Sequence, residues 1–323
     1  MQKILLTTTM LLLLVMGSVG VAFAADSTGT INVVAECTIT STELWDAAWV
    51  VDKNGAQLTV NTEYRINFTI SDTDGMDDIV NANITIWDSA TSTVGLADDQ
   101  NDHYTFMWDG AVTGAWSCLG PDAGFYKGGS GSNSSLVTQY EFYLAFDLSK
   151  VAQYSNGGAP FDGWKITINA TDTEPNTDEE SECLNFGVSE YMETSGLAGT
   201  HAWNSLAPNS NNNALSDPVG KLSFTAIANR VWNATTYGSA DPTDAPYSFG
   251  IGNITVYSAD TVGSSVPLVN TPSKITIGTL GDTAVPNTEA GTACECWMWI
   301  DIPAGQQPGA YTYTLTILVE WAT

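Results

Sequence analysis

Residues 64–70 read Tyr-Arg-Ile-Asn-Phe-Thr-Ile, and this short stretch points to the fold class. Apolar side chains occupy every second position, namely Tyr64, Ile66, Phe68 and Ile70. Successive side chains of an extended strand point to opposite faces, so this alternation predicts a strand that is buried on one face only.

The same alternation recurs along the chain. It is present near residues 79–86, along residues 164–171 and over residues 311–321. We find no helical periodicity after residue 24. Many short strands separated by Gly, Asn, Asp and Pro turns are typical of β-sandwiches. We therefore expect an all-β protein with two tandem antiparallel β-sandwich domains of the immunoglobulin-like kind.

The first residues have the layout of a secretory signal peptide. Lys3 supplies a positive charge, an apolar run follows over residues 4–15, and Ala22-Phe23-Ala24 is a small-x-small cleavage signal. The run is short for a membrane span, so we expect cleavage after residue 24 rather than a retained anchor. No later segment approaches the roughly 18 apolar residues that a membrane helix needs, so we expect no transmembrane anchor after cleavage.

Changes in composition suggest the domain plan. Residues 172–182 form an acidic tract without large apolar side chains, which is typical of a linker or an exposed loop. We expect the following segments: an N-terminal strand at 25–42, a first sandwich at 43–173, an acidic linker at 174–182 and a second sandwich at 183–323. Each sandwich is long enough to bury its own core.

The chain is strongly acidic, with 36 acidic and 9 basic side chains and a formal net charge of −27. Removal of Lys3 with the signal peptide leaves 8 basic against 36 acidic residues, hence −28. A chain of this charge does not bind nucleic acid by counterion release, and it repels anionic membranes. The composition therefore favours a soluble extracellular protein that attracts cations.

Residues 28–40 form a well-patterned strand just after the cleavage signal. Its apolar phase consists of Ile31, Val33, Ala35, Cys37 and Ile39. This strand could pair within the first sandwich, reach the second sandwich, or insert into a neighbouring molecule. The sequence leaves these three alternatives open.

Five cysteines are candidates for disulfides, namely Cys37, Cys118, Cys183, Cys294 and Cys296. An oxidising compartment favours disulfides, and the odd number leaves one thiol over or paired between chains. Cys294 and Cys296 lie on one face of a predicted strand, about 6.6 Å apart at Cα. That geometry suits a disulfide poorly, so we expect each to pair elsewhere, with Cys37 as a candidate partner. We disfavour a thiolate metal site because no third ligand lies nearby.

An acidic loop over residues 71–78 separates two predicted strands. Its carboxylates are Asp72, Asp74, Asp77 and Asp78. Ca²⁺ takes six to eight oxygen ligands, so this loop is a candidate calcium site. An Asp-Gly turn capped by its own carboxylates explains the same residues equally well. A second, weaker oxygen cluster consists of Asp98, Asp99, Asn101 and Asp102.

Asn-x-Ser/Thr sequons suggest a glycoprotein. They begin at Asn67, Asn83, Asn133, Asn169, Asn233 and Asn253. We place Asn67, Asn83, Asn169 and Asn253 opposite the apolar face of their own predicted strands, where a glycan would point to solvent. Some of the matches arise by chance in a chain rich in Asn and Thr. We expect at least two sites to be occupied if the source organism has the machinery.

No catalytic residues stand out in the sequence. The histidines, His103 and His201, lie in polar loop settings, and no Ser-His-Asp order, His-Glu-x-x-His motif or glycine-rich phosphate loop is present. Carboxylate pairs of glycosidases are set by spatial spacing, so a secreted hydrolase stays a remote alternative. Some tryptophans could stack on sugars, although we expect most of them to pack in the cores.

Residues 67–87 resemble a known kind of module. Their sequence, Asn-Phe-Thr-Ile-Ser-Asp-Thr-Asp-Gly-Met-Asp-Asp-Ile-Val-Asn-Ala-Asn-Ile-Thr-Ile-Trp, looks like the Ig-like β-sandwich modules of archaeal secreted surface proteins. In those modules an Asp-x-Asp-Gly turn joins two core strands. Residues 164–172 are similar to the last strand of such a module, and residues 302–317 resemble the closing hairpin of exported sandwiches. These signals imply a fold that many functions share.

A looser resemblance is to subunits of archaeal extracellular filaments, the threads and bundling pili, and to bacterial TasA-like fibre proteins. Those subunits donate an N-terminal strand to the next subunit, and residues 28–40 have the placement for that role. The resemblance implies a secreted structural cell-surface protein that polymerises with itself and is not an enzyme, with Cys37 as a candidate intermolecular lock. The alternative is a calcium-dependent adhesin or a carbohydrate-binding protein that contacts cell-surface glycans.

Overall fold

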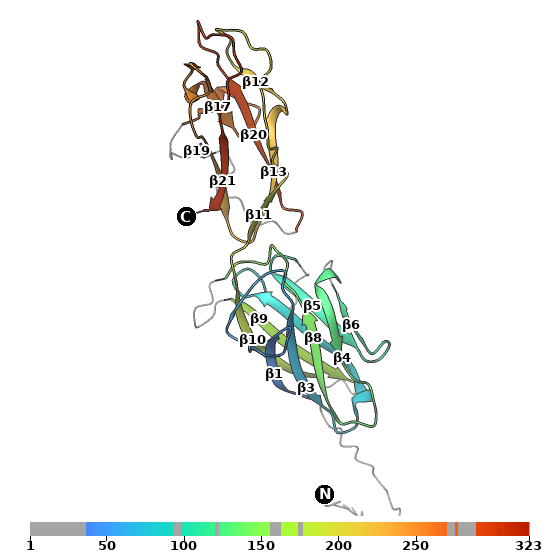
Figure 1. Ribbon diagram of the computed structural model, residues 1–323. Helices are drawn as coiled ribbons and strands as arrows, with labels where there is room; N and C mark the ends of the chain where they lie inside the picture. The colour runs from blue at the N-terminus through green and yellow to red at the C-terminus, as the bar shows by residue number, and fades with distance from the viewer. Residues whose placement is uncertain are drawn as a thin grey trace, which may run out of the picture. The chain divides into compact units, whose positions relative to one another are not determined.

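The computed structural model describes residues 37–93, 99–119, 123–155, 163–173, 177–269, 275–276 and 289–322 (Figure 1). Within these ranges the chain forms β-strands and short 3-10 turns, and none of the described residues is in an α-helix. The turns are η1 (Met76–Asp78), η2 (Ala123–Phe125), η3 (Ile251–Asn253) and η4 (Val262–Ser264). The all-β prediction is confirmed. The predicted signal peptide, residues 1–24, lies outside the described residues.

The first group of strands forms two sheets. One has four strands in the order β1 (Thr38–Asp46), β3 (Tyr64–Ser71), β8 (Gln139–Phe146) and β7 (Tyr126–Ser130). The other has six, in the order β2 (Gln57–Leu58), β10 (Thr177–Val188), β9 (Trp164–Asp172), β4 (Ile79–Asp88), β5 (His103–Asp109) and β6 (Ala115–Cys118). Neighbouring strands pair antiparallel, except that β2 runs parallel to β10.

These two sheets face each other across an aromatic core. The ring of Trp108 on β5 contacts Phe142 on β8 at 5.0 Å between centroids, and Phe68 on β3 contacts Trp116 on β6 at 6.3 Å. Burial alternates strictly along β3, so that the residues predicted to be apolar and inward are buried and those between them are half-buried. The alternation read from residues 64–70 is therefore confirmed as one face of a sandwich.

The acidic tract is not a linker from Thr177 onward, which corrects the predicted domain plan. Thr177 pairs with Thr171 at the start of β10, and Glu179 pairs with Asn169. Exposed acidic side chains fill the first half of β10, whereas its second half buries Leu184 and other apolar residues in the first core. A strand with an outward charged face satisfies its backbone in the sheet and its carboxylates in water. Consequently residues 164–172 are followed along the chain by another strand of the same sheet, so they are not the last strand of the first sandwich.

A second group of strands forms a six-stranded and a three-stranded sheet. The six-stranded order is β11 (Met192–Ser195), β13 (Val219–Ala228), β12 (Asn213–Ser216), β20 (Thr292–Ile300), β17 (Ile254–Tyr257) and β18 (Val266–Pro267), with β13 also paired to β20. The three-stranded order is β19 (Ile275–Thr276), β14 (Trp232–Gly238) and β21 (Leu315–Trp321). A short hairpin pairs β15 (Thr243–Asp244) with β16 (Tyr247–Ser248).

The second group has its own core, which draws on both of its sheets. Trp232 of β14 is buried in one cluster with Phe224 of β13 and Cys294 of β20. Strands β20 and β21 belong to different sheets, so the hairpin expected from residues 302–317 is not formed. The predicted strand over residues 311–321 begins at Leu315, and the residues before it form a loop.

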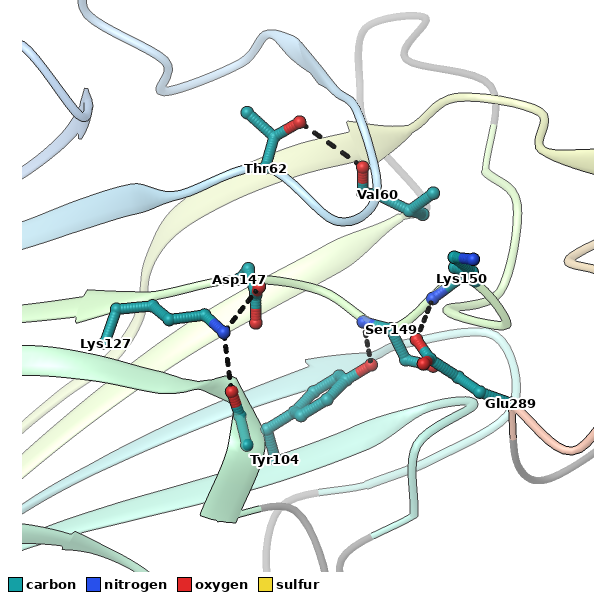
Figure 2. A network of polar contacts seen from close by, with 9 residues as sticks. Val60, Thr62, Tyr104, Lys127, Asp147, Ser149, Lys150 and Glu289 are labelled. Atoms are coloured by element: carbon teal, nitrogen blue, oxygen red, sulfur yellow. Dashed lines mark hydrogen bonds and ion pairs between the residues drawn. The ribbon is translucent and has the colours of Figure 1, made fainter.

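A polar network links the segment after β8 to residues of the second group (Figure 2). The carboxylate of Glu289 accepts hydrogen bonds from the Ser149 hydroxyl at 3.1 Å and from the Lys150 backbone N–H at 2.8 Å. Asp147, which is 6% exposed, pairs with Lys127 at 3.0 Å. The buried carboxylate is thus compensated by an opposite charge, as buried charges require.

Candidate functional site

The described end of the N-terminal strand belongs to the first sandwich. Cys37 and Ile39 are buried in the first core, in the phase that the sequence predicts. From Thr38 onward the strand pairs antiparallel with β3, and Ile39 lies opposite Ile70. Of the predicted assembly strand, Ile31, Val33 and Ala35 lie outside the described residues. Residues from Thr38 onward are therefore part of the chain's own sheet. A segment donated to another molecule would have to end before Cys37.

Two polar contacts fix this entry point. The Ile39 backbone N–H donates to the carboxylate of Asp178 at 2.6 Å, and the Cys37 thiol donates to the Ala170 carbonyl at 3.7 Å. Asp178 lies in the acidic half of β10, so this tract anchors the first strand as well as completing its own sheet. Burial, reinforced by the negative charge of Asp172, raises the pKa of Cys37 to about 11.

No disulfide joins any two of the five cysteines, all of which lie in the described ranges. Cys294 and Cys296 are on one face of β20, as predicted, but they enter two different apolar clusters. Cys183 donates to the Ile166 carbonyl at 3.5 Å instead of meeting another sulfur. The expected disulfides are therefore absent from the structure. The burial of Cys37 also removes it as an intermolecular lock.

Strand β21 forms an open edge of its sheet within the described part of the chain. It pairs with β14 along its whole length, from Leu315 opposite Gly238 to Trp321 opposite Trp232. Its inward apolar residues pack against the two clusters of the second core, and they are Leu315, Ile317, Val319 and Trp321. Yet every residue of β21 is only half-buried, whereas most of β14 is buried.

An edge strand presents unpaired backbone N–H and C=O groups on its open side. Strand β21 combines such an edge with apolar side chains that are partly in contact with water. The sequence predicted the strand and its alternation but carried no sign that it would lie at an edge, because strand order depends on contacts far apart in the chain. Within the described residues, this edge is therefore one place at which a further strand could pair.

The carboxylates of the acidic loop after β3 differ in burial. Asp72 is buried and its side chain accepts a hydrogen bond from the Asp74 backbone N–H at 2.9 Å, whereas Asp74 and Asp77 are exposed. Gly75 has a φ of 125°, and a Cβ there would come within 2.6 Å of the Asp77 carboxylate. In the described ranges, no three acidic, thiol or imidazole groups are placed to hold a metal. This arrangement is a turn capped by its own carboxylate, and calcium binding at the loop stays a prediction.

The second oxygen cluster is also used locally. Asp99 forms a backbone bridge with His103 and accepts a hydrogen bond from the Asn101 backbone N–H at 2.7 Å. Desolvation raises the pKa of Asp102, and the nearby Asp99 charge adds to the shift. Asp98 lies outside the described residues.

The sequon asparagines are half-buried or exposed in the structure. Asn83 and Asn169 are direct cross-strand partners on β4 and β9, on the face opposite the core. Asn67 lies on β3 and donates to the Glu141 carboxylate. Asn253 differs from expectation because it ends the η3 turn just before β17. Glycosylation of these residues, and of Asn133 and Asn233, stays a prediction.

Of the two histidines expected in polar loops, His103 lies in a strand, and His201 lies in a loop but among aromatic rings. His103 begins β5 and is 1% exposed. His201 packs edge-on against Tyr313 at 5.1 Å between ring centroids. Trp108, Trp116, Trp164, Trp232 and Trp299 are buried, as expected for tryptophans that pack in the cores, whereas Trp203, Trp297 and Trp321 are half-buried.

No family model and no curated protein matches the chain. In the part of the chain that is described, no helix has the length and apolar character needed to cross a membrane.

Proposed function

We propose that this chain is a secreted structural protein of the cell surface that assembles with copies of itself by β-strand addition and has no catalytic role. The observation that carries this proposal is the open edge of β21, with its half-buried inward apolar side chains. We further propose that the strand added there consists of residues 28–36 of another copy.

The donor segment matches the acceptor edge in length and pattern. A strand rises about 3.3 Å per residue, so residues 28–36 span about 30 Å and exceed the length of the seven-residue β21. Ile31, Val33 and Ala35 share one phase of the segment, which gives it an apolar face to turn toward the second core, while Val34 is an apolar residue on the other face. Full burial of each such side chain contributes about 1.5–3 kcal/mol, and the backbone pairs add hydrogen bonds.

The anchoring of Cys37 and Ile39 gives the donor segment a fixed root. The segment immediately precedes a strand that is held in the sheet of its own molecule, so pairing with another copy would join two folded sandwiches through a continuous backbone. Donor and acceptor are different surfaces, so the contact is heterologous. Contacts of this type propagate into filaments when the rotation does not close a ring.

Negative-stain electron microscopy of the chain beginning at residue 25 tests this proposal. We expect filaments with a regular repeat, and we expect deletion of residues 26–36 to abolish them while circular dichroism stays unchanged. A peptide of residues 26–36 should bind the deletion variant. Filaments formed by the deletion variant would refute strand donation, and uniform monomers of the undeleted chain would refute self-assembly.

A point variant tests the acceptor edge separately. Val319→Asp should block assembly, because it places a charge on the inward face of β21. The matched control is Val219→Asp at the start of β13, where the side chain is 84% exposed and lies outside the proposed contact. Equal loss of filaments in both variants would mean that the added negative charge, and not its position on β21, blocks assembly.

A further inference from the structure

Connecting segments of the second group enclose a pocket of about 540 Å³. Its floor contains Phe249, Ile254 and Ile300, which are buried core residues. Its walls come from residues 201–208 and 302–313. The volume falls within the range of about 300–1,000 Å³ that is typical of small-molecule sites.

The aromatic rings of the pocket are held at their polar edges. The Trp203 indole N–H donates to the Asn213 carbonyl at 3.0 Å, and the Tyr311 hydroxyl donates to the Gln307 carbonyl at 2.8 Å. The Tyr313 hydroxyl lies 2.6 Å from Nε2 of His201. Trp203 also stacks on Tyr313, with ring centroids 6.3 Å apart. The polar edges of these rings are therefore occupied within the protein, so a ligand in the pocket meets ring carbon rather than free hydrogen-bonding edges.

The described residues that line the pocket include no acidic or basic side chain of Asp, Glu, Lys or Arg, although the chain has a formal net charge of −27. Burial lowers the pKa of His201 and raises the pKa of Tyr313, so both are uncharged near neutral pH. A charged ligand would lose its hydration here without meeting an opposite charge. The pocket is therefore suited to an uncharged ligand.

The rim carries two side-chain amides, each of which uses one N–H within the protein and keeps its second N–H and its oxygen. The side-chain amide of Gln306 donates to the Tyr311 hydroxyl at 2.5 Å, and that of Gln307 donates to the Gly305 carbonyl at 3.3 Å. Their amide oxygens accept no hydrogen bond from any described residue. A matching ligand therefore carries both hydrogen-bond donors and acceptors beside an apolar surface. Proline-rich peptides also pack on aromatic rings, but proline has no N–H to offer these oxygens.

We propose that this pocket binds an uncharged saccharide. A pyranose ring has an apolar face of C–H bonds that stacks on the aromatic wall beside Trp203. Its hydroxyl groups donate to the amide oxygens of Gln306 and Gln307. The site is independent of strand addition, because its lining residues are not part of β21.

A glycan array probed with the chain beginning at residue 25 tests this proposal. The array carries neutral hexose and N-acetylhexosamine oligosaccharides, sialylated and sulfated glycans, and a proline-rich decapeptide. We expect retention on neutral glycans alone. Trp203→Ala should weaken that binding by about tenfold or more.

Two further variants keep the test decisive. Gln307→Ala alters an exposed rim residue, so it should fold normally and weaken binding even if Trp203→Ala does not fold. Trp297→Ala is the matched control, because Trp297 packs beside Lys221 at 4.9 Å rather than in the pocket, and it should bind as the unaltered chain does. The proposal is overturned if no neutral glycan is retained, if both pocket variants bind unchanged, or if the decapeptide competes for the site.

Discussion

Cys37 should remain a thiol in the folded protein and should not cross-link two molecules. Its side chain is 2% exposed, and burial together with the charge of Asp172 raises its pKa from 9.0 to about 11. Two pKa units lower the thiolate fraction about a hundredfold at pH 8. Because the thiolate is the nucleophile, alkylation of Cys37 should be at least about a hundredfold slower in the folded chain than in the unfolded chain.

Differential alkylation measures this rate. The native chain is pulsed with iodoacetamide at pH 8, quenched, unfolded and labelled with a second reagent, and peptide masses then give the labelled fraction at each cysteine. Cys296, whose pKa burial raises to about 12, serves as the protected internal reference. Rapid native labelling of Cys37 would refute the reasoning. A disulfide-linked dimer that Cys37→Ser removes would refute it as well.

Phe142→Ala should lower the free energy of unfolding by about 3–5 kcal/mol, because the buried ring contacts Phe68 and Trp108. Chemical denaturation measures this loss, and a loss below about 1 kcal/mol would contradict the prediction. Glu289→Ala should cost about 1–3 kcal/mol in the same assay, and Glu289→Gln should cost less because it keeps an acceptor oxygen. Desolvation raises the pKa of Asp88 in the folded chain above its ordinary value of 3.8, so the folded state holds this proton more tightly than the unfolded state does. The stability that protonated Asp88 contributes is therefore fully present below pH 3.8 and is lost as the pH rises through the folded pKa. The thermal midpoint should therefore rise from pH 7 toward pH 4 by less in Asp88→Asn than in the unaltered chain, and equal rises would count against this. Filament yield should increase between about 20 and 300 mM salt, because salt screens the repulsion between acidic subunits.

Strand positions could be read from the sequence where one face is buried and the other is wet. Residues 64–70 and 164–171 show this, because period two is a local property of the pleat and is written into neighbouring residues. The prediction that the acidic tract is a linker was wrong because it used the side chains alone. Its charges indicated exposure correctly, but exposure of one face does not exclude a strand whose backbone pairs with β9.

The candidate sites depended on distances that no sequence pattern contains. The carboxylates of the acidic loop are adjacent in sequence, yet Asp72 turns inward while Asp74 stays in water. An oxidising compartment led us to expect disulfides, yet none of the five cysteines is bonded to another. The pocket around Trp203 joins segments a hundred residues apart in the chain, which is why no motif announces it.

The sequence by itself determined the all-β class, the acidic surface and the inward phase of Cys37 and Ile39, since each follows from composition or from local alternation. Only the tertiary structure decided that β21 lies at an open edge and that Trp203 faces a neutral pocket. The physical reason is that strand order and cavities arise from long-range pairing. A strand carries the same alternation whether its neighbour is present or missing.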